Sequence, residues 1–369
     1  RLCDRHDDDW PHCYHLGADA FVLMWQADEL SHPALERLAA QLLGQLERPI
    51  EWQGQNFHVG ASIGIAAGLG DEAETLVRRA DAALSRAKQH GRHRWMFFDP
   101  AWQEEMLCRV QINMRLQQAL QHNLLHVHYQ PVVTLNGEPE AFEALVRWED
   151  ETLGRVQPED FVPVAEASGL INALTRRVVE QVLVDLARWQ QVMGALPFRV
   201  AINLSPLDLT AEQVERIMDR LRDHHLTGQV EFELTESRSL EQNEDAGNLL
   251  ALMQQEGVRA VAIDDFGSGY ASLARIKQLA VDKLKIDQSL VRDLTRDEMD
   301  LEIARAAVSM GHALGLKVVA EGVETETHYR LLRALGVDLL QGYFISPPLA
   351  ADAVPDWLRQ WRGFPRGDQ

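Results

Sequence analysis

Short apolar runs alternate with amphipathic stretches from about residue 125 to the end of the chain. A first strand is predicted over 126–135, with further strands near 198–203, 229–234, 259–264, 282–286, 316–320 and 337–340. Helical spacing of apolar residues predicts helices over 170–193 and near 210–224, 239–256, 271–278, 297–314 and 325–335. Pro158 suits the first turn of one more helix, because an amide is not needed there. This rhythm predicts an α/β barrel.

The first hundred residues follow a different pattern. A strand is predicted over 21–25, a helix with a leucine stripe over 35–46, a buried strand with close-packed glycines over 59–66, and a second helix over 76–88. Residues 101–122 predict a polar helix with apolar positions at Met106, Val110, Met114 and Leu116. We therefore divide the chain into a domain at 1–100, a linker helix at 101–122, a second domain at 123–362 and a tail at 363–369.

Composition agrees with two domains, since 369 residues exceed the roughly 250–300 that a single core supports. There are 36 basic and 56 acidic residues, so the formal charge is −20. That charge argues against a DNA or RNA polymer as partner, because such a protein presents a basic face. It does not exclude a small phosphodiester, because bound divalent cations supply positive charge locally.

The same composition indicates a reducing compartment. Three scattered cysteines do not form a disulfide framework. No stretch approaches the ~18 apolar residues that indicate a membrane span. We expect a cytoplasmic domain; because the sequence starts at Arg1, the full-length protein could carry a membrane or sensor region upstream.

Polar side chains with oxygen atoms follow the predicted strands. They are Glu143, Asn203, Glu233, the pair Asp264 and Asp265, and Glu321. Barrels of alternating strands and helices gather functional side chains at the C-terminal ends of their strands. Carboxylate and amide oxygens are the ligands that hard divalent cations prefer. The pattern predicts one metal pocket built from the last residues of several strands.

The barrel segment, from about residue 121 to about residue 362, resembles an EAL domain, the family of cyclic di-GMP phosphodiesterases. The motifs that carry the resemblance occur in the family order: Tyr129-Gln-Pro131, Glu143-Ala-Leu145, Asn203-Leu-Ser205, Glu233-Leu-Thr-Glu236, Asp264-Asp-Phe-Gly-Ser-Gly-Tyr270, Lys285-Ile-Asp287, Glu321-Gly-Val-Glu324 and Gln341-Gly-Tyr343. The resemblance implies a TIM-like barrel with an altered strand direction near its start. It also implies hydrolysis of cyclic di-GMP to linear pGpG with two Mg²⁺ or Mn²⁺ ions, and a homodimer formed through this domain.

The resemblance also implies roles for single residues. Glu143, Asn203, Glu233 and Asp264 would hold one ion, and Asp264 and Asp265 the other. Lys285 would orient or polarise the attacking water, and Glu321 would be either the general base or a partner of the second metal. Substrate contacts are expected from Gln130, Leu145, Arg147, Asn203, Asp265, Lys285 and Gln341, and supporting loop contacts from Glu236, Phe266, Gly267, Gly269 and Glu324. Glu324 could instead simply begin a helix, where negative charge is favoured.

The N-terminal segment resembles the later part of a GGDEF domain, the diguanylate cyclase fold. Ala61-Ser-Ile-Gly-Ile65 and the run from Ala80 to Gly91 carry this resemblance. The hairpin that gives the family its name reads Gly17-Ala-Asp-Ala-Phe21, so Ala20 stands where the resemblance implies a metal-binding acid. We expect no cyclase activity from this truncated, degenerate domain.

Several alternatives remain open at this point. The barrel could be a cyclic di-GMP receptor without catalysis, and the N-terminal domain could bind GTP and tune the barrel. The cluster of Cys3, His6, His12, Cys13 and His15 invites a zinc site, but its spacing does not match the usual patterns. Trp148 could stack on a guanine or belong to the core.

Overall fold

The computed structural model describes residues 12–17, 19–24, 31–53, 55–57, 59–68, 71–89, 91, 93–235, 240, 243–267, 276–295 and 298–364. The chain divides into two compact units, residues 1–108 and 109–369, and each is described by itself.

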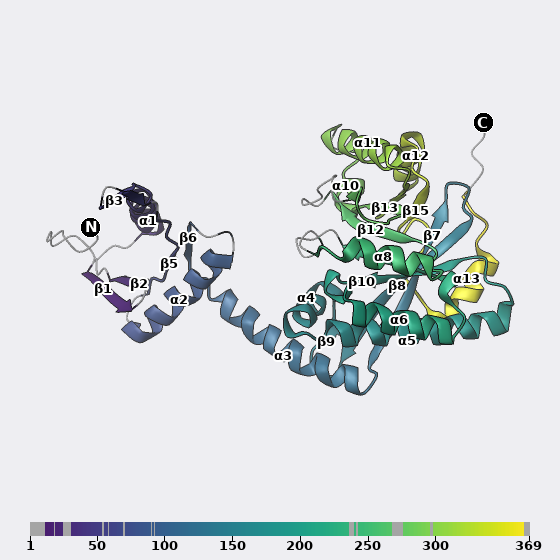
Figure 1. The fold of residues 1–369 in the computed structure, drawn as a ribbon, viewed down its shortest axis with the longest axis horizontal. Helices are drawn as coiled ribbons and strands as arrows, with labels where there is room; N and C mark the ends of the chain where they lie inside the picture. The colour runs from purple at the N-terminus through teal and green to yellow at the C-terminus, as the bar shows by residue number, and fades with distance from the viewer. Residues whose placement is uncertain are drawn as a thin grey trace. The chain divides into compact units, whose positions relative to one another are not determined.

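The described residues of the first unit form small two-stranded sheets and helices (Figure 1). Strands β1 (His12–Gly17) and β2 (Ala20–Met24) form a hairpin, β3 (Ile50–Trp52) pairs with β4 (Gln55–Phe57), and β5 (Ile63–Ile65) lies parallel to β6 (Trp95–Phe97). Helices α1 (His32–Leu46) and α2 (Ala73–Gln89) match the predicted helices. The strand expected over 59–66 is shorter than predicted. Gly64 lies in a close backbone approach, as predicted, because a Cβ there would lie 2.0 Å from the Ala80 carbonyl oxygen of α2.

Helix α3 (Ala101–Gln121) occupies the predicted linker. Ile112, Leu116 and Ala119 are buried in a cluster of the second unit that includes Phe161. Of the four apolar positions singled out in the sequence, Leu116 is buried, whereas Met106, Val110 and Met114 are exposed.

The second unit is a closed barrel. Seven strands run in one direction, each parallel to the next in this order: β8 (Pro139–Asp150), β10 (Arg199–Leu204), β11 (Val230–Thr235), β12 (Val261–Phe266), β13 (Lys283–Ile286), β14 (Lys317–Ala320) and β15 (Leu339–Gln341). The eighth, β7 (Leu125–Thr134), runs antiparallel to both β8 and β15 and closes the barrel between them. This confirms the altered strand direction that the family resemblance implied. Short strands β9 (Gly154–Val156) and β16 (Leu349–Ala350) extend the sheet.

Strand β8 is longer than the barrel requires. Beyond Glu143 it continues to Asp150, because Leu145 pairs with His128 and Arg147 with His126 on β7. Glu143 therefore lies in the middle of a strand, and the expectation that it ends one was wrong. Glu233 and Asp264 also lie two residues before the last residue of their strands.

Helices cover the outside of the barrel (Figure 1). They include α4 (Pro158–Ser168), α5 (Ile171–Met193), α6 (Ala211–Asp223), α8 (Ala246–Gln255), α11 (Glu298–Ala313) and α12 (Glu326–Leu335), with the shorter α10 (Gln288–Arg292) and α13 (Val354–Gln360). The helix predicted near 239–256 is α8, which begins later than expected; the one predicted near 271–278 lies mainly outside the described residues.

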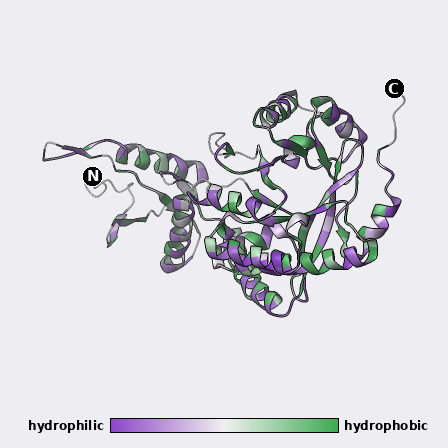
Figure 2. Cartoon of the chain, turned by 45° about the vertical axis from the view of Figure 1, so that its right-hand side comes forward, coloured by the Kyte–Doolittle hydropathy of each residue, from purple (hydrophilic) through white to green (hydrophobic). Residues whose placement is uncertain are grey.

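Sequence chemistry accounts for how these helices begin and pack. Pro158 stands in the first turn of α4, as predicted. The Thr210 side chain accepts from the Gln213 amide and caps α6, whose Ile217 and Leu221 are buried. In Figure 2 the helices around the barrel carry both hydrophobic and hydrophilic stretches. Their apolar faces join the barrel's outward residues in the main core.

Candidate active site

Lys285 lies at the centre of the candidate site, on β13 and inside the barrel. Its side chain is 1% exposed. Its Nζ lies 2.6 Å from Glu233 Oε2, 3.2 Å from Asp264 Oδ1, 3.4 Å from Glu143 Oε2 and 2.5 Å from Glu321 Oε1. One ammonium therefore joins carboxylates from β8, β11, β12 and the segment that follows β14.

The carboxylates form two groups that share Asp264. Oxygens of Glu143, Glu233 and Asp264 lie within 4.8 Å of one another, and so do oxygens of Asp264, Asp265 and Glu321. Spacing of this kind lets three side chains share one cation, and carboxylates are suited to a hard divalent ion. Asn203 stands beside the first group, since its Nδ2 lies 2.7 Å from Glu143 Oε1. The residues present therefore fit a divalent cation in each group.

Burial and mutual repulsion perturb the acids of this cluster. Burial raises the pKa of Glu321 to about 8 and of Asp265 to about 6, and it also raises those of Glu233 and Asp264. Burial alone would raise the pKa of Glu143 too, but Lys285 and the Gln341 and Asn203 amides lower it. Burial disfavours the Lys285 ammonium, yet the surrounding carboxylates raise its pKa well above the ordinary value. The site therefore contains one buried ammonium, that of Lys285, and a larger number of carboxyl groups around it.

Asp265 has an unusual backbone. Its φ is +58°, a left-handed conformation that a non-glycine residue rarely adopts. The pairing between β12 and β13 is irregular between Ile263 and Phe266, which is where this residue stands. Its amide donates to Asp264 Oδ1 at 3.0 Å. The irregularity turns two consecutive carboxylates toward one group, which a regular strand would send to opposite faces.

Two glutamines border the cluster. Gln341 Nε2 donates to Glu143 Oε2 at 2.6 Å and to Gln130 Oε1 at 3.2 Å, and Gln130 Nε2 donates to the Ser346 carbonyl oxygen. Gln341 Oε1 is buried and has no partner among the described residues. Gly342 permits the end of β15 to lie this close, because a Cβ there would lie 2.2 Å from the Val323 amide nitrogen.

The remaining predicted residues occupy varied places. Leu145 and Arg147 are half-buried on β8, and Arg147 donates to the Val146 carbonyl oxygen.

Phe266 packs against both large core clusters. Gly267 has a φ of +106°, and a Cβ there would lie 2.5 Å from Leu290 Cδ1. Glu324 is exposed just before the Thr325 cap of α12 and belongs to neither carboxylate group. Glu236 and Gly269 lie outside the described residues.

Two supporting contacts were missed in the sequence. Ser205, part of the Asn203-Leu-Ser205 motif, donates its hydroxyl to Glu166 Oε1 at 2.7 Å, so α4 is tied to the end of β10. The Tyr129 hydroxyl, from the Tyr129-Gln-Pro131 motif, donates to Asp185 of α5 at 2.6 Å. The motifs indicated that Ser205 and Tyr129 matter, but nothing in them indicated their partners.

Trp148 belongs to the core. It is 1% exposed and meets Phe161 edge-on, with ring centroids 5.5 Å apart, so stacking on a base is excluded for this conformation. Cys3 and His6 of the suggested zinc cluster lie outside the described residues. His15 lies against the Phe21 ring, and no metal group among the described residues includes His12, Cys13 or His15.

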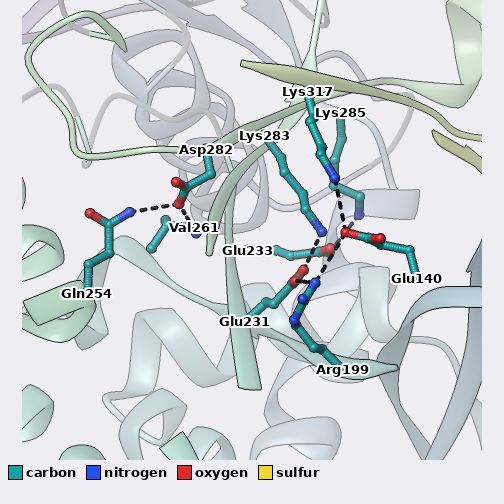
Figure 3. Close-up of polar contacts among 10 residues, drawn as sticks. All are labelled: Glu140, Arg199, Glu231, Glu233, Gln254, Val261, Asp282, Lys283, Lys285 and Lys317. Carbon is teal, nitrogen blue, oxygen red and sulfur yellow. Dashed lines mark hydrogen bonds and ion pairs between the residues drawn. The ribbon is translucent and has the colours of Figure 1, made fainter. Parts of the chain in front are cut away.

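A second layer of ion pairs lies beneath the site (Figure 3). Lys283 and Glu231 stand two residues before Lys285 and Glu233 on the same strands, and Lys283 Nζ lies 2.5 Å from Glu231 Oε2. Arg199 contacts both Glu231 and Glu140, at 3.3 and 3.2 Å, and Lys317 contacts Glu140 at 3.2 Å. An alternating chain of charges therefore runs from the buried Lys283 and Glu231 through Arg199 and Glu140 to the exposed Lys317.

Comparisons with known proteins agree with this architecture. The EAL domain model matches residues 113–348, and the model of the diguanylate cyclase, GGDEF domain matches residues 11–94. Cyclic di-GMP phosphodiesterase PdeR of Escherichia coli is 32% identical over 94% of this chain and 52% of its own length. Bifunctional diguanylate cyclase/cyclic di-GMP phosphodiesterase MucR of Pseudomonas aeruginosa is 36% identical over 92% of this chain and 50% of its own. The chain spans about half the length of the curated relatives it matches.

Solved structures show the same barrel. The PaMucR phosphodiesterase in complex with c-di-GMP has a TM-score of 0.62 and 37% identity, and the match covers 66% of this chain and 99% of that one. The EAL domain of Mycobacterium smegmatis DcpA has a TM-score of 0.55 and 33% identity, over 66% and 99% of the two chains. Among the described residues, no helix is both long and apolar enough to cross a bilayer. The chain therefore belongs to the EAL family, with its EAL barrel preceded by a GGDEF domain.

Proposed function

We propose that the barrel hydrolyses cyclic di-GMP to linear pGpG with the help of two divalent ions, Mg²⁺ or Mn²⁺. The observation that carries this proposal is the pair of carboxylate groups that share Asp264 around Lys285. The names of the relatives supply the substrate, since PdeR and MucR are cyclic di-GMP phosphodiesterases by name.

The side chains divide the work as follows. Glu143, Glu233 and Asp264, with Asn203, would hold one ion, and Asp264, Asp265 and Glu321 the other. When bound, such ions make a nucleophile from water at neutral pH and neutralise phosphate oxygens. Lys285 offers donor hydrogens to the attacking water.

Substrate binding would use residues that border Glu143. Arg147, on the part of β8 that continues beyond Glu143, offers a planar guanidinium for a phosphate. Gln130 and Gln341 would position the substrate next to Glu143, and Leu145 gives a nucleotide an apolar contact. Gln341 Oε1 has no partner among the residues that the structure describes, and it would accept a hydrogen bond from a donor on the ligand.

Product analysis tests the proposal. The protein is incubated with cyclic di-GMP in Mg²⁺, in Mn²⁺ and in chelator, and the nucleotides are separated by chromatography. We expect pGpG in both metals and intact substrate in chelator. Glu233→Gln should abolish turnover, whereas Glu231→Gln, two residues earlier on β11 and outside both carboxylate groups, should keep it. Intact substrate under every condition would refute hydrolysis.

A receptor without catalysis is the second candidate for the barrel. Calorimetric binding of cyclic di-GMP without product in any metal would establish it. The complete set of carboxylates around Lys285 favours the enzyme, because a receptor does not need two carboxylate groups that share Asp264.

We infer no cyclase activity for the GGDEF domain. Ala20 pairs with Gly17 across the turn of the β1–β2 hairpin, so a methyl group stands where the family resemblance implies an acid. Incubation with GTP and Mg²⁺ should give no cyclic di-GMP. A GTP titration that changes the phosphodiesterase rate would show that this domain binds GTP and regulates the barrel; a flat titration would remove that role.

The family resemblance also supports a cytoplasmic homodimer formed through the EAL barrel. Light scattering of the full chain and of residues 109–369 tests this assembly. Equal dimerisation of both would place the interface on the barrel unit, and a monomeric full chain would refute the dimer.

A further inference from the structure

Lys285 contacts the same carboxylates that would hold the first ion. Three of its four partners, Glu143, Glu233 and Asp264, are the members of the first carboxylate group. Its fourth partner, Glu321, belongs to the second group. A lysine that served only to orient a water would not need contact with every acid of the first group.

An ammonium and a divalent ion make conflicting demands on these oxygens. Lys285 Nζ is 2.6 Å from Glu233 Oε2 and 3.2 Å from Asp264 Oδ1. A Mg²⁺ ion needs its oxygen ligands at about 2.0–2.1 Å. It would repel a positive charge placed among the same oxygens, and that repulsion is strong in a buried site of low effective dielectric.

We propose that Lys285 is a built-in counter-ion that competes with the first divalent ion for Glu143, Glu233 and Asp264. Entry of the ion requires the ammonium to give up its contacts with Glu233 and Asp264. Glu321, at 2.5 Å, is the partner it can keep. The lysine thereby holds the acids together without metal and sets how tightly the first ion binds. This inference rests on the metal site of the proposed function.

The chain contains a matched control. Lys283 lies two residues earlier on β13, is also buried, and pairs with Glu231 at 2.5 Å (Figure 3). Arg199 gives Glu231 a second cationic partner, and Glu231 belongs to neither carboxylate group. Removing the charge of Lys283 therefore leaves the acids of the metal site unchanged.

Metal affinity is the first measurement. Mn²⁺ binding is followed by calorimetry for the wild-type chain, Lys285→Met and Lys283→Met, because methionine has a similar length and no charge. We expect Lys285→Met to bind the first ion at least tenfold more tightly and Lys283→Met to stay within about threefold of wild type. Equal or weaker binding by Lys285→Met would overturn the counter-ion, while metal-dependent turnover by the wild type would still support the enzyme. No Mn²⁺ binding by any of the three would refute both proposals.

A measurement on the wild-type chain avoids reliance on a variant that fails to fold. The sequence contains only five lysines, at positions 88, 277, 283, 285 and 317. Protein labelled with ¹³C at the lysine ε-carbons therefore gives five NMR signals. Substitution of the other four lysines assigns their signals and leaves the fifth to Lys285. Titration with diamagnetic Mg²⁺ should shift the Lys285 signal strongly and leave the Lys283 signal close to its original position. Saturating Mg²⁺, confirmed by calorimetry, with an unmoved Lys285 signal would overturn the proposal.

Thermal stability gives a third readout. In chelator, Lys285→Met should melt below the wild type, because the four acids lose the ammonium that contacts all of them. Saturating Mn²⁺ should raise its melting temperature by more than it raises that of the wild type. A variant as stable as wild type in chelator, with the same shift in Mn²⁺, would contradict the proposed role.

Discussion

Gln341 Nε2 donates a 2.6 Å hydrogen bond to Glu143 Oε2, while Asn203 Nδ2 donates to the other oxygen of the same carboxylate at 2.7 Å. Glu143 is therefore oriented by amides from β15 and β10 as well as by Lys285. Such orientation limits the geometries in which the carboxylate can bind an ion. The charge of Lys285 and the hydrogen bonds from Gln341 and Asn203 also lower the pKa of Glu143, although burial would raise it.

Glu143→Ala should abolish turnover while the fold is kept. The loss should exceed the ~10–100-fold effect typical of residues that only support a ligand. The variant leaves the Gln341 and Asn203 amides without their acceptor, so some stability should be lost, and the loss of turnover counts only if the fold is retained. Turnover and circular dichroism check both points. Glu138→Ala, an exposed glutamate just before the same strand, is the control and should behave as wild type.

Glu321→Gln decides between the two roles of Glu321. Its carboxylate belongs to the group of Asp264 and Asp265, so we expect it to be a partner of the second ion. Calorimetry with Mn²⁺ should then show one strong site instead of two, together with lost turnover. Two ions bound with turnover still lost would identify Glu321 as the general base. Glu324→Gln, at the other end of the Glu321-Gly-Val-Glu324 motif, should leave ion number and turnover unchanged, because Glu324 is exposed.

Tyr129→Phe should destabilise the barrel by about 1–3 kcal/mol, the usual cost of leaving a buried polar group without its partner. Tyr129 is fully buried, and its hydroxyl donates to Asp185, which is 4% exposed. Urea unfolding followed by tryptophan fluorescence measures the change. Asp185 keeps contacts from Gln181, so the double variant with Asp185→Asn should lose less than the sum of the single variants. Strict additivity would show that the two residues do not interact.

Glu140→Gln should make the barrel less sensitive to acid. Burial alone would raise the pKa of Glu140, but Lys317, Lys283 and Arg199 lower it below 4.5. A carboxyl whose pKa is lowered on folding stabilises the protein above its unfolded pKa, and this stabilisation is lost as pH falls through the folded pKa. The melting temperatures of wild type and variant should therefore differ near neutral pH and converge below pH 4.5. A constant difference across that range would contradict the ion pairs; Glu138→Gln is the control.

Much of the barrel could be predicted from sequence, because buried strands are short apolar runs between polar turns. The strands β10 to β15 begin or end within a few residues of the predictions. The direction of β7 could not be derived from its residues, since an apolar run of that length suits either direction. It entered through the family resemblance, and pairing with β8 and β15 confirmed it.

The site was predicted less completely than the fold. The sequence placed Glu143, Glu233, Asp264 and Glu321 at predicted strand ends, which gather at one edge of a barrel. The four do gather, although Glu143 lies in the middle of β8 and Glu233 and Asp264 lie two residues before the ends of their strands. The family resemblance implied that the charge of Lys285 offsets the carboxylate cluster. Distances across the barrel are not encoded in spacing along the chain, so direct contact with four of the acids was not predicted. Nor does the sequence show that Asp265 has a positive φ, because that conformation depends on the irregular pairing of β12 with β13.

The antiparallel strand β7 has a consequence for synthesis on the ribosome. Its pairing with β8 joins nearby segments and can form early. Its other neighbour, β15, carries Gln341, which lies 211 residues after its hydrogen-bond partner Gln130. One edge of β7 therefore remains unpaired while nearly the whole barrel is translated. An unpaired strand edge can pair with a strand of another chain and so promote aggregation. The nascent chain completes its active site only when the last barrel strand leaves the exit tunnel, so a chain that stops before β15 yields an open sheet and no partial enzyme.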